Sequence, residues 1–256
     1  MITKPNQMRL LCALMFSSFL SSLSAQTPVS STNQPAPAAA KKPAATRPMD
    51  FAGLRCYREA NAKLPPPAAG ENRIVFFGDS ITEAWNRYHK EFFTGRLYFD
   101  RGISGQTTSQ MVIRFRQDVI ALKPKVVVIL AGINDVAGNS GPATLEDIEG
   151  NLTSMVELAK ANGIRVVLSS ILPADRLPWR PELPNPTEKV LALNAWLKDY
   201  AAKNGCVYLD YFSALADPQN AMKKELQEDA VHPDRAGYDV MEPLAEKAIA
   251  AALSAK

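Results

Sequence analysis

The chain has 256 residues, of which 46% are hydrophobic and 21% are charged, and it contains 13 Gly, 19 Pro and 3 Cys. These proportions exclude a collagen-like chain, a small disulfide-stapled protein and a wholly disordered chain. The formal net charge is +3, but residues 1–49 hold five Lys and Arg with no Asp or Glu. Without these five of the 29 basic residues, 24 Lys and Arg face 26 Asp and Glu. Because nucleic-acid binding requires a clustered basic surplus, we expect no nucleic-acid partner.

The first residues resemble a secretory signal peptide. Lys4 and Arg9 precede an apolar run at 10–23, and the small residues at 24–25 offer a cleavage site. A membrane anchor or a buried helix is the alternative, but the run contains serines and is shorter than the roughly 20 apolar residues that span a bilayer. We therefore expect residues 1–25 to be a cleaved signal peptide, with a secreted or periplasmic product and no stable membrane insertion.

Residues 26–49 are rich in Ala, Pro, Thr and Ser and offer little apolar surface to offset chain entropy. They are expected to form a disordered linker ahead of one domain at 50–256. Two cysteines, Cys56 and Cys206, lie in that domain. An oxidising compartment permits a disulfide between them, but we favour two buried free thiols, because the sequence gives no distance between the pair.

Beyond residue 49, short runs of β-branched and aromatic residues alternate with helical periodicity. Such alternation is typical of parallel strands joined by helical crossovers. The unbroken apolar run at 126–130 indicates a central strand covered on both faces. We therefore expect an α/β fold with a five-stranded parallel sheet. The expected strands are 73–78, 97–102, 125–131, 164–170 and 206–209.

Three long helices are expected at 144–162, 187–204 and 234–253. Thr144 and Asp147 have the spacing of a capping box at the start of the first of these helices. An Asn-Gly pair ends each of the first two, as is common at helix C-termini. The first two of these helices supply crossovers that a parallel sheet needs, and the last closes the domain.

Polar and glycine-rich segments follow the first three expected strands, and another precedes the last helix. Functional groups of an open parallel sheet gather at the carboxyl edge, where the strands end. Each segment alone fits a helix cap or a turn, but four at such positions are improbable by chance. The segments are Gly78-Asp79-Ser80, Ser104-Gly105-Gln106, Gly132-Ile133-Asn134-Asp135 and Asp229-Ala230-Val231-His232.

Together, these segments suit acyl transfer. The Ser80 hydroxyl lies at a strand-to-helix junction, and a serine nucleophile needs a base to take its proton. His232 is the expected base, because the other histidine, His89, lies in a polar stretch and is expected to be a solvated surface residue. Asp229 comes three residues before His232, so that one turn can bring its carboxylate to Nδ1 of the ring.

The tetrahedral intermediate of acyl transfer needs hydrogen-bond donors aimed at its oxyanion. The backbone N–H groups of Ser80 and Gly105 and the side-chain amide of Asn134 are the expected donors. Asp79 and Asp135 are expected to be structural, tying the loops of the site together through hydrogen bonds to backbone.

In order and content, the four segments resemble those of the SGNH hydrolases, also called the GDSL lipase/esterase family. The resemblance covers about residues 73–243. It implies a flavodoxin-like three-layer α/β/α sandwich and the same roles for the serine, histidine, aspartate, glycine and asparagine named above. It also implies that the enzyme needs no metal or organic cofactor. Ile81 replaces the leucine of the family name, which puts no catalytic group in doubt.

The loop at 173–181 is stiffened by prolines and is expected to overhang Ser80. Trp179 could stack on a sugar ring, and Arg176 or Arg180 could bind an acidic sugar or a phosphate. Equally open is the alternative in which Trp179 packs on its own loop and the arginines are solvated.

No amphipathic apolar lid for long acyl chains is visible in the sequence. We therefore expect an exported serine ester hydrolase that forms a Ser80 acyl-enzyme and removes short acyl groups, acetyl above all, from a small-molecule or polysaccharide ester. One alternative is a lysophospholipase or thioesterase of the same family, and another is a non-catalytic carbohydrate-binding protein on the same fold. The hypothesis requires Ser80 Oγ and His232 Nε2 to lie about 2.6–3.2 Å apart.

Overall fold

A parallel sheet of five strands lies at the centre of residues 50–255, which are the residues that the computed structural model describes. The strand order is β2-β1-β3-β4-β5, and every neighbouring pair is parallel. Each strand begins and ends within one residue of its expected position, which confirms the predicted α/β sheet. The strands are β1 (Ile74–Gly78), β2 (Tyr98–Gly102), β3 (Val126–Leu130), β4 (Arg165–Ser169) and β5 (Val207–Leu209).

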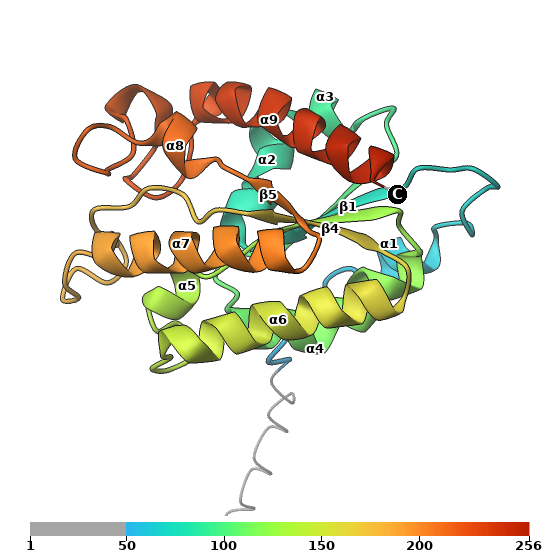
Figure 1. Ribbon diagram of the computed structural model, residues 1–256, viewed down its shortest axis with the longest axis horizontal. Coiled ribbons are helices and arrows are strands. Elements are labelled where there is room, and N and C mark those ends of the chain that lie inside the picture. Colours follow the sequence, from blue (N-terminus) through green and yellow to red (C-terminus); the bar gives the residue numbers. More distant parts are fainter. Residues whose placement is uncertain (1–49, 256) are drawn as a thin grey trace, which may run out of the picture. The chain divides into compact units, whose positions relative to one another are not determined.

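Helices cover both faces of this sheet and complete the expected three-layer sandwich (Figure 1). One face carries α2, α3, α8 and α9, and the other carries α4, α5, α6 and α7, with α1 packed beside α4. The helices on the first face are α2 (Ser80–Tyr88), α3 (Lys90–Phe93), α8 (Phe212–Leu215) and α9 (Arg235–Ser254). The others are α1 (Arg58–Ala62), α4 (Thr108–Asp118), α5 (Ile133–Val136), α6 (Leu145–Ala161) and α7 (Thr187–Lys203), with short 3₁₀ turns η1 (Ile120–Leu122) and η2 (Lys224–Leu226).

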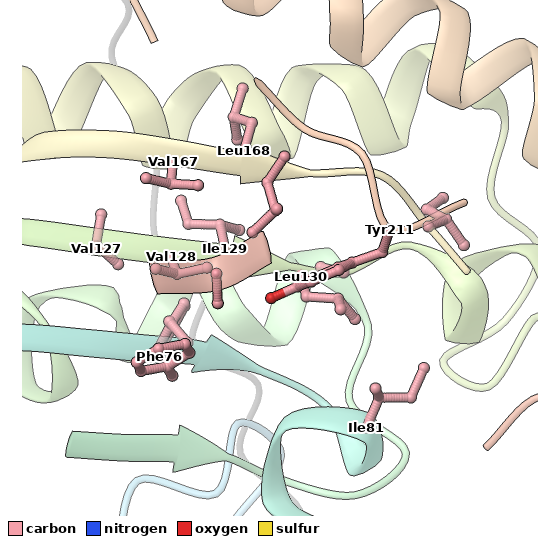
Figure 2. Packing of buried hydrophobic residues seen from close by; sticks show 14 of the residues in the cluster. Phe76, Ile81, Val127, Val128, Ile129, Leu130, Val167, Leu168 and Tyr211 are labelled. Carbon is pink, nitrogen blue, oxygen red and sulfur yellow. The ribbon is translucent and has the colours of Figure 1, made fainter. Parts of the chain in front are cut away.

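The core of the domain is built on β3, whose five residues are all buried. Figure 2 shows Val128 of β3 among the buried side chains of the neighbouring strands, and it pairs with Phe76 of β1 and with Val167 of β4. Phe76 meets Trp85 and Phe92 edge to face, with ring centroids 5.5 and 5.6 Å apart. Burial of each large apolar side chain stabilises the fold by about 1.5–3 kcal/mol, so this core holds the sheet that positions the site.

Side-chain caps set the start of α6 and of α9, the helix that closes the domain. The Thr144 hydroxyl accepts the N–H of Asp147 at 3.1 Å, and the Asp147 carboxylate accepts the N–H of Thr144 at 2.9 Å, which confirms the predicted capping box of α6. Asp234 caps α9 by accepting the N–H of Gly237 at 3.0 Å. Each cap satisfies N–H groups that have no partner within the helix.

His89 is a correction to the sequence analysis, because the expected solvated imidazole is 3% exposed. It lies between the end of α2 and helix α9, which crosses over it. Its Nδ1 is 3.0 Å from Glu242 Oε1, and its Nε2 is 3.3 Å from Asp239 Oδ1. Its Nε2 also lies 3.2 Å from the carbonyl oxygen of Arg235. The polar neighbours of His89 in sequence gave no sign that α9, about 150 residues later, packs against it.

The two cysteines of the described domain are unpaired, as expected. Cys56 is exposed rather than buried, because it lies on a turn ahead of α1, and Cys206 is half-buried. The predicted signal peptide at 1–25 and linker at 26–49 lie outside the described residues. Within 50–255, no helix combines the length and the apolar character needed to cross a bilayer.

Candidate active site

Three of the four predicted segments meet because β2, β1 and β3 end in register. Gly78 at the end of β1 pairs with Gly102 of β2 and with Leu130 of β3. A side chain on Gly78 would overlap the hydroxyl of Thr82, and one on Gly102 would overlap the backbone of Glu83. Only glycine therefore lets helix α2 begin this close to both strand ends, and this places Ser80 between them.

Asp79 fixes the turn that presents Ser80. Its Oδ1 accepts the N–H of Ile81 at 3.0 Å, and its Oδ2 accepts Nδ2 of Asn134 at 3.2 Å. The side chain is fully buried, and burial raises the pKa of Asp79 to about 6. One carboxylate thus links the segment after β1 to the segment after β3.

Asp135 forms the corresponding link between the segments after β3 and β2. It accepts the N–H of Thr108 at 2.9 Å and the Thr108 hydroxyl at 2.6 Å. Burial raises the pKa of Asp135 above its ordinary value. Asp79 and Asp135 both accept backbone N–H groups, which is the structural part that the sequence suggested for them.

His232 lies within hydrogen-bond distance of Ser80, although 152 positions separate them. Ser80 Oγ and His232 Nε2 are 2.9 Å apart, inside the range that the acyl-transfer hypothesis requires. Asp229 Oδ1 and Oδ2 lie 3.0 and 2.9 Å from His232 Nδ1. A carboxylate facing Nδ1 places the ring proton on that nitrogen, so Nε2 is free to accept the serine proton.

The turn at 229–232 holds the carboxylate of Asp229 in place. Oδ1 of Asp229 also accepts the N–H groups of Val231 at 3.1 Å and His232 at 2.9 Å. Partial burial acts against ionisation of Asp229, but hydrogen bonds from the backbone and ring of His232 outweigh it and lower the pKa of this carboxyl. Asp229 is therefore a carboxylate near neutral pH, which is the form that stabilises an imidazolium.

The three predicted oxyanion donors, Ser80, Gly105 and Asn134, lie around one cavity. Gly105 has φ +76°, a left-handed conformation that glycine adopts without strain. Asn134 is buried, and its Nδ2 donates to the carbonyl of Gln106 at 3.0 Å in addition to its contact with Asp79. Its Nδ2 thus lies on the side of the amide that faces the turn at Ser80.

Two cavities flank the Ser80 hydroxyl, and Ser80, Ser104 and His232 line both. We name the first the Trp179 cavity; its volume is about 320 Å³ and it is also lined by Gly105, Asn134, Asn139 and Trp179. We name the second the Arg87 cavity; its volume is about 380 Å³ and it is also lined by Glu83, Ala84, Arg87 and Glu228. A substrate carbonyl at Ser80 therefore has room for one substituent on either side.

Other features of the described residues do not compete with this site. A larger cavity of about 630 Å³ lies where β1, β3 and β4 begin, at the opposite edge of the sheet. It contains none of the predicted nucleophile, base or donor residues. Between residues 50 and 255, no cluster of three or more His, Cys, Asp and Glu has the arrangement of metal ligands.

Of the three loop residues suggested for substrate binding, only Trp179 reaches the cavities. Its ring centroid is 6.0 Å from that of His232, and its indole N–H donates to Asn139 Oδ1 at 3.0 Å. Arg176 faces the neighbouring Asp175 in the loop, and Arg180 donates to the carbonyl of Ala137 at 2.7 Å. Neither arginine is among the residues that line the two cavities.

The sequence analysis missed four polar residues of the site. Glu83 and Arg87 follow Ser80 at helical spacing on α2, a signal that periodicity could have found. Arg87 Nη2 pairs with Glu228 Oε2 at 3.3 Å across the Arg87 cavity. The fourth, Asn139, lies in a turn five residues after Asn134, and its spacing gave no signal.

Comparison with known proteins agrees with this geometry. Residues 76–240 match the model of the GDSL-like lipase/acylhydrolase family. A crystal structure of a candidate acylhydrolase from Bacteroides fragilis is 46% identical, with a TM-score of 0.79 over 80% of this chain and 99% of that one. A GDSL-like lipase from Bacteroides thetaiotaomicron is 45% identical, with a TM-score of 0.78 over 79% of this chain and 100% of that one.

A curated relative, the uncharacterized lipoprotein YqeF of Bacillus subtilis, is 27% identical over 121 residues. That match takes in 41% of this chain and 50% of the relative, so the chain spans about half the length of the curated relative. The family model, by contrast, covers more than half of the chain, and the two crystal structures are matched over nearly their whole length. The chain therefore belongs to the GDSL-like lipase/acylhydrolase family and is an esterase of the SGNH type.

Proposed function

We propose that this esterase is exported and removes short acyl groups, acetyl above all, from carbohydrate by way of a Ser80 acyl-enzyme. The observation that carries the proposal is a chain of two hydrogen bonds. Ser80 Oγ lies 2.9 Å from His232 Nε2, and His232 Nδ1 lies 2.9 Å from Asp229 Oδ2. This arrangement supplies a nucleophile, a base and a carboxylate that orients the base.

In the first half of the reaction, Ser80 Oγ attacks the ester carbonyl carbon and its proton passes to His232 Nε2. The carbonyl oxygen becomes an oxyanion and receives hydrogen bonds from the N–H groups of Ser80 and Gly105 and from Asn134 Nδ2. One such donor is worth about 10²–10³ in turnover. The bond to the alcohol oxygen then breaks, and that oxygen takes the proton from His232. The products of this half are the free alcohol and acyl-Ser80.

In the second half, a water molecule gives one proton to His232 Nε2 and attacks the acyl carbon. The same donors hold the second oxyanion. The Ser80 ester bond breaks, Ser80 Oγ takes the proton back from His232, and the carboxylic acid leaves. In both halves the carboxylate of Asp229 stabilises the imidazolium that forms on His232.

The side chains around the two cavities support a short acyl group and a polar alcohol. Neither cavity is lined by a row of aliphatic side chains, which a long acyl chain would need in order to leave water. In the Arg87 cavity, Arg87, Glu83 and Glu228 offer donors and acceptors that suit sugar hydroxyls. Two carboxylates against one guanidinium favour a neutral sugar over an acidic one.

Export is supported by the signal-like pattern of residues 1–25. The curated relative is described as a lipoprotein, which is a statement about that protein, and it agrees with an extracytoplasmic location for this one. An acetylesterase outside the cytoplasm meets acetylated polysaccharides directly, without uptake. Detection of the mature protein, cleaved near residue 25, outside the cytoplasm tests this part of the proposal.

The test of the chemistry is hydrolysis of 4-nitrophenyl acetate by the wild type and by Ser80→Ala. Ser80→Ala should abolish turnover, because among residues 50–255 the hydroxyl in hydrogen-bond contact with Nε2 of His232 is that of Ser80. Ser154→Ala is a matched control, since Ser154 is a half-buried serine on α6 that bonds only to the carbonyl of Gly150 among the described contacts. Equal turnover in Ser80→Ala and Ser154→Ala would refute the proposed mechanism.

Substrate preference needs two further measurements. The rate on 4-nitrophenyl esters should fall as the acyl chain lengthens from acetyl to octanoyl, and acetate should be released from acetylated xylan. A preference for octanoyl would favour a lysophospholipase or thioesterase instead. Binding of acetylated glycan without acetate release would favour a carbohydrate-binding protein.

A further inference from the structure

The geometry points to Asn139 as a positioning residue that holds two parts of the oxyanion site from different segments, Asn134 and Gly105, at a fixed separation. The inference rests on the proposed esterase mechanism and adds a residue that does not itself react. Asn139 follows α5 in a turn, and its backbone N–H donates to the carbonyl of Asn134 at 3.0 Å. Its side chain is thereby anchored close to both groups.

One nitrogen of Asn139 contacts both donor residues. Asn139 Nδ2 donates to Asn134 Oδ1 at 2.8 Å and to the carbonyl of Gly105 at 3.2 Å. Asn134 belongs to the segment after β3, and Gly105 belongs to the segment after β2. The amide of Asn139 is therefore a bridge between two loops whose separation sets the width of the oxyanion site.

Trp179 determines which way the Asn139 amide faces. An indole nitrogen can only donate, and Trp179 Nε1 lies 3.0 Å from Asn139 Oδ1. The oxygen of Asn139 must therefore face Trp179, which leaves Nδ2 to face Asn134 and Gly105. The orientation follows from the chemistry of tryptophan and does not depend on distinguishing nitrogen from oxygen by position.

The bridge also acts on the amide of Asn134 itself. With Oδ1 of Asn134 occupied by Asn139, its Nδ2 is held on the side of Asp79 and Gln106, next to Ser80. A hydrogen bond donated to an amide oxygen polarises that amide and strengthens the bonds that its N–H groups donate. Asn139 thus positions Asn134 Nδ2, and a developing oxyanion would take over the hydrogen that makes the longer contact, at 3.2 Å to Asp79.

The Asn139→Asp variant tests this bridge with almost no change in volume. Aspartate keeps an acceptor for Trp179 but cannot donate, and its charge faces the oxygens of Asn134 and Gly105. We expect kcat for 4-nitrophenyl acetate to fall about 10-fold to 100-fold with KM changed less than about 3-fold, because the bridge acts on the transition state. Binding of a trifluoromethyl ketone, which forms an oxyanion on Ser80, should weaken by a similar factor.

Two further variants separate positioning from loop stability. Trp179→Phe keeps an aromatic ring but loses the N–H, and a loss of about 3-fold to 10-fold in kcat is expected, since one hydrogen bond is removed. Ser140→Ala is the matched control in the same turn. Its hydroxyl bonds to Thr107 Oγ1 at 2.7 Å and not to the oxyanion segments, so kcat should stay within about 2-fold of the wild type.

The decisive measurement is a double-mutant cycle with Asn134→Ala. If Asn139 acts through Asn134, adding Asn139→Asp to Asn134→Ala should lower kcat by less than about 3-fold. A full additional loss in that background, or a loss confined to KM, would overturn the inference. Failure of the proposed function itself looks different, because Ser80→Ala would then match the wild type on 4-nitrophenyl acetate.

Discussion

Asp79 holds the turn at Ser80, and its ionisation should impose a measurable pH dependence on stability. The carboxyl is fully buried, and its oxygens accept the N–H of Ile81 and Nδ2 of Asn134. Burial raises its pKa from 3.8 to about 6. The Asp79→Asn variant keeps the size of the side chain and removes the ionisation.

The raised pKa means that the folded protein binds this proton more tightly than the unfolded chain does. At a pH well below 3.8 the carboxyl of Asp79 is protonated in both states, and as the pH rises toward 6 the unfolded chain releases its proton first. Ionisation therefore stabilises the unfolded state across this window. A shift of about two pKa units corresponds to about 3 kcal/mol of folding free energy, which is lost by pH 7.

Urea denaturation of the wild type and Asp79→Asn at several pH values between about 4 and 8 measures this difference. The wild type should lose about 2.5 kcal/mol more than the variant across this range, because part of the total is already lost at pH 4. A lost hydrogen bond to Asn134 would shift the whole curve of the variant without changing its pH dependence. Asp199→Asn is the control, because the side chain of Asp199 is 59% exposed and its curve should run parallel to that of the wild type.

Parallel curves for the wild type and Asp79→Asn between pH 4 and pH 8 would refute the reasoning. Such a result would mean that hydrogen bonds from Ile81 and Asn134 compensate fully for the desolvation of the carboxylate. The Asp79 carboxyl would then titrate near its ordinary value in the folded protein. The burial of Asp79 would be neutral for stability rather than a cost of building the site.

Three other substitutions test separate parts of the structure. Asp229→Asn should lower kcat for 4-nitrophenyl acetate by about 10³-fold to 10⁴-fold, because an amide cannot stabilise the His232 imidazolium. The melting temperature should change little. A small effect on kcat would remove Asp229 from the mechanism. Arg87→Ala should lower kcat/KM for acetylated xylooligosaccharides by about 10-fold. The loss for 4-nitrophenyl acetate should be less than about 2-fold, since this ester has no sugar hydroxyls to bind. Equal losses would contradict a sugar site in the Arg87 cavity. His89→Gln should lower the free energy of unfolding in urea by about 1–3 kcal/mol, through the lost hydrogen bond to the carbonyl of Arg235 and the lost contacts with Glu242 and Asp239, with unchanged esterase activity. An unchanged stability would mean that these contacts contribute nothing.

The sheet and the meeting of the catalytic segments could be predicted from the sequence because both follow from local patterns. An apolar run such as Val126–Leu130, rich in β-branched residues, is typical of a strand covered on both faces, and parallel strands bring their carboxyl ends to one edge. The same reasoning predicts that Ser80 and Asn134 lie near each other. Asp229 and His232 are three residues apart, so a single turn was enough to predict their contact.

The side-chain contacts between distant segments could not be predicted in this way. The burial of His89 depends on Asp239 and Glu242 of α9, whose side chains reach it only because that helix crosses over the end of α2. Arg180 is held by the backbone carbonyl of Ala137, a partner that offers no sequence signal at all. Contacts of this kind depend on how loops pack, and hydrophobic periodicity carries no information about that.

Trp179 combines a partly exposed ring with a hydrogen bond from its edge. The sequence left open whether its ring would stack on a sugar or pack on its own loop. In the structure the side chain is 36% exposed beside His232, while its N–H is used by Asn139. Stacking uses the faces of an indole ring and the hydrogen bond uses its edge, so the two contacts do not compete. Any substrate group that enters the Trp179 cavity would therefore contact the same side chain that orients Asn139, and through it Asn134.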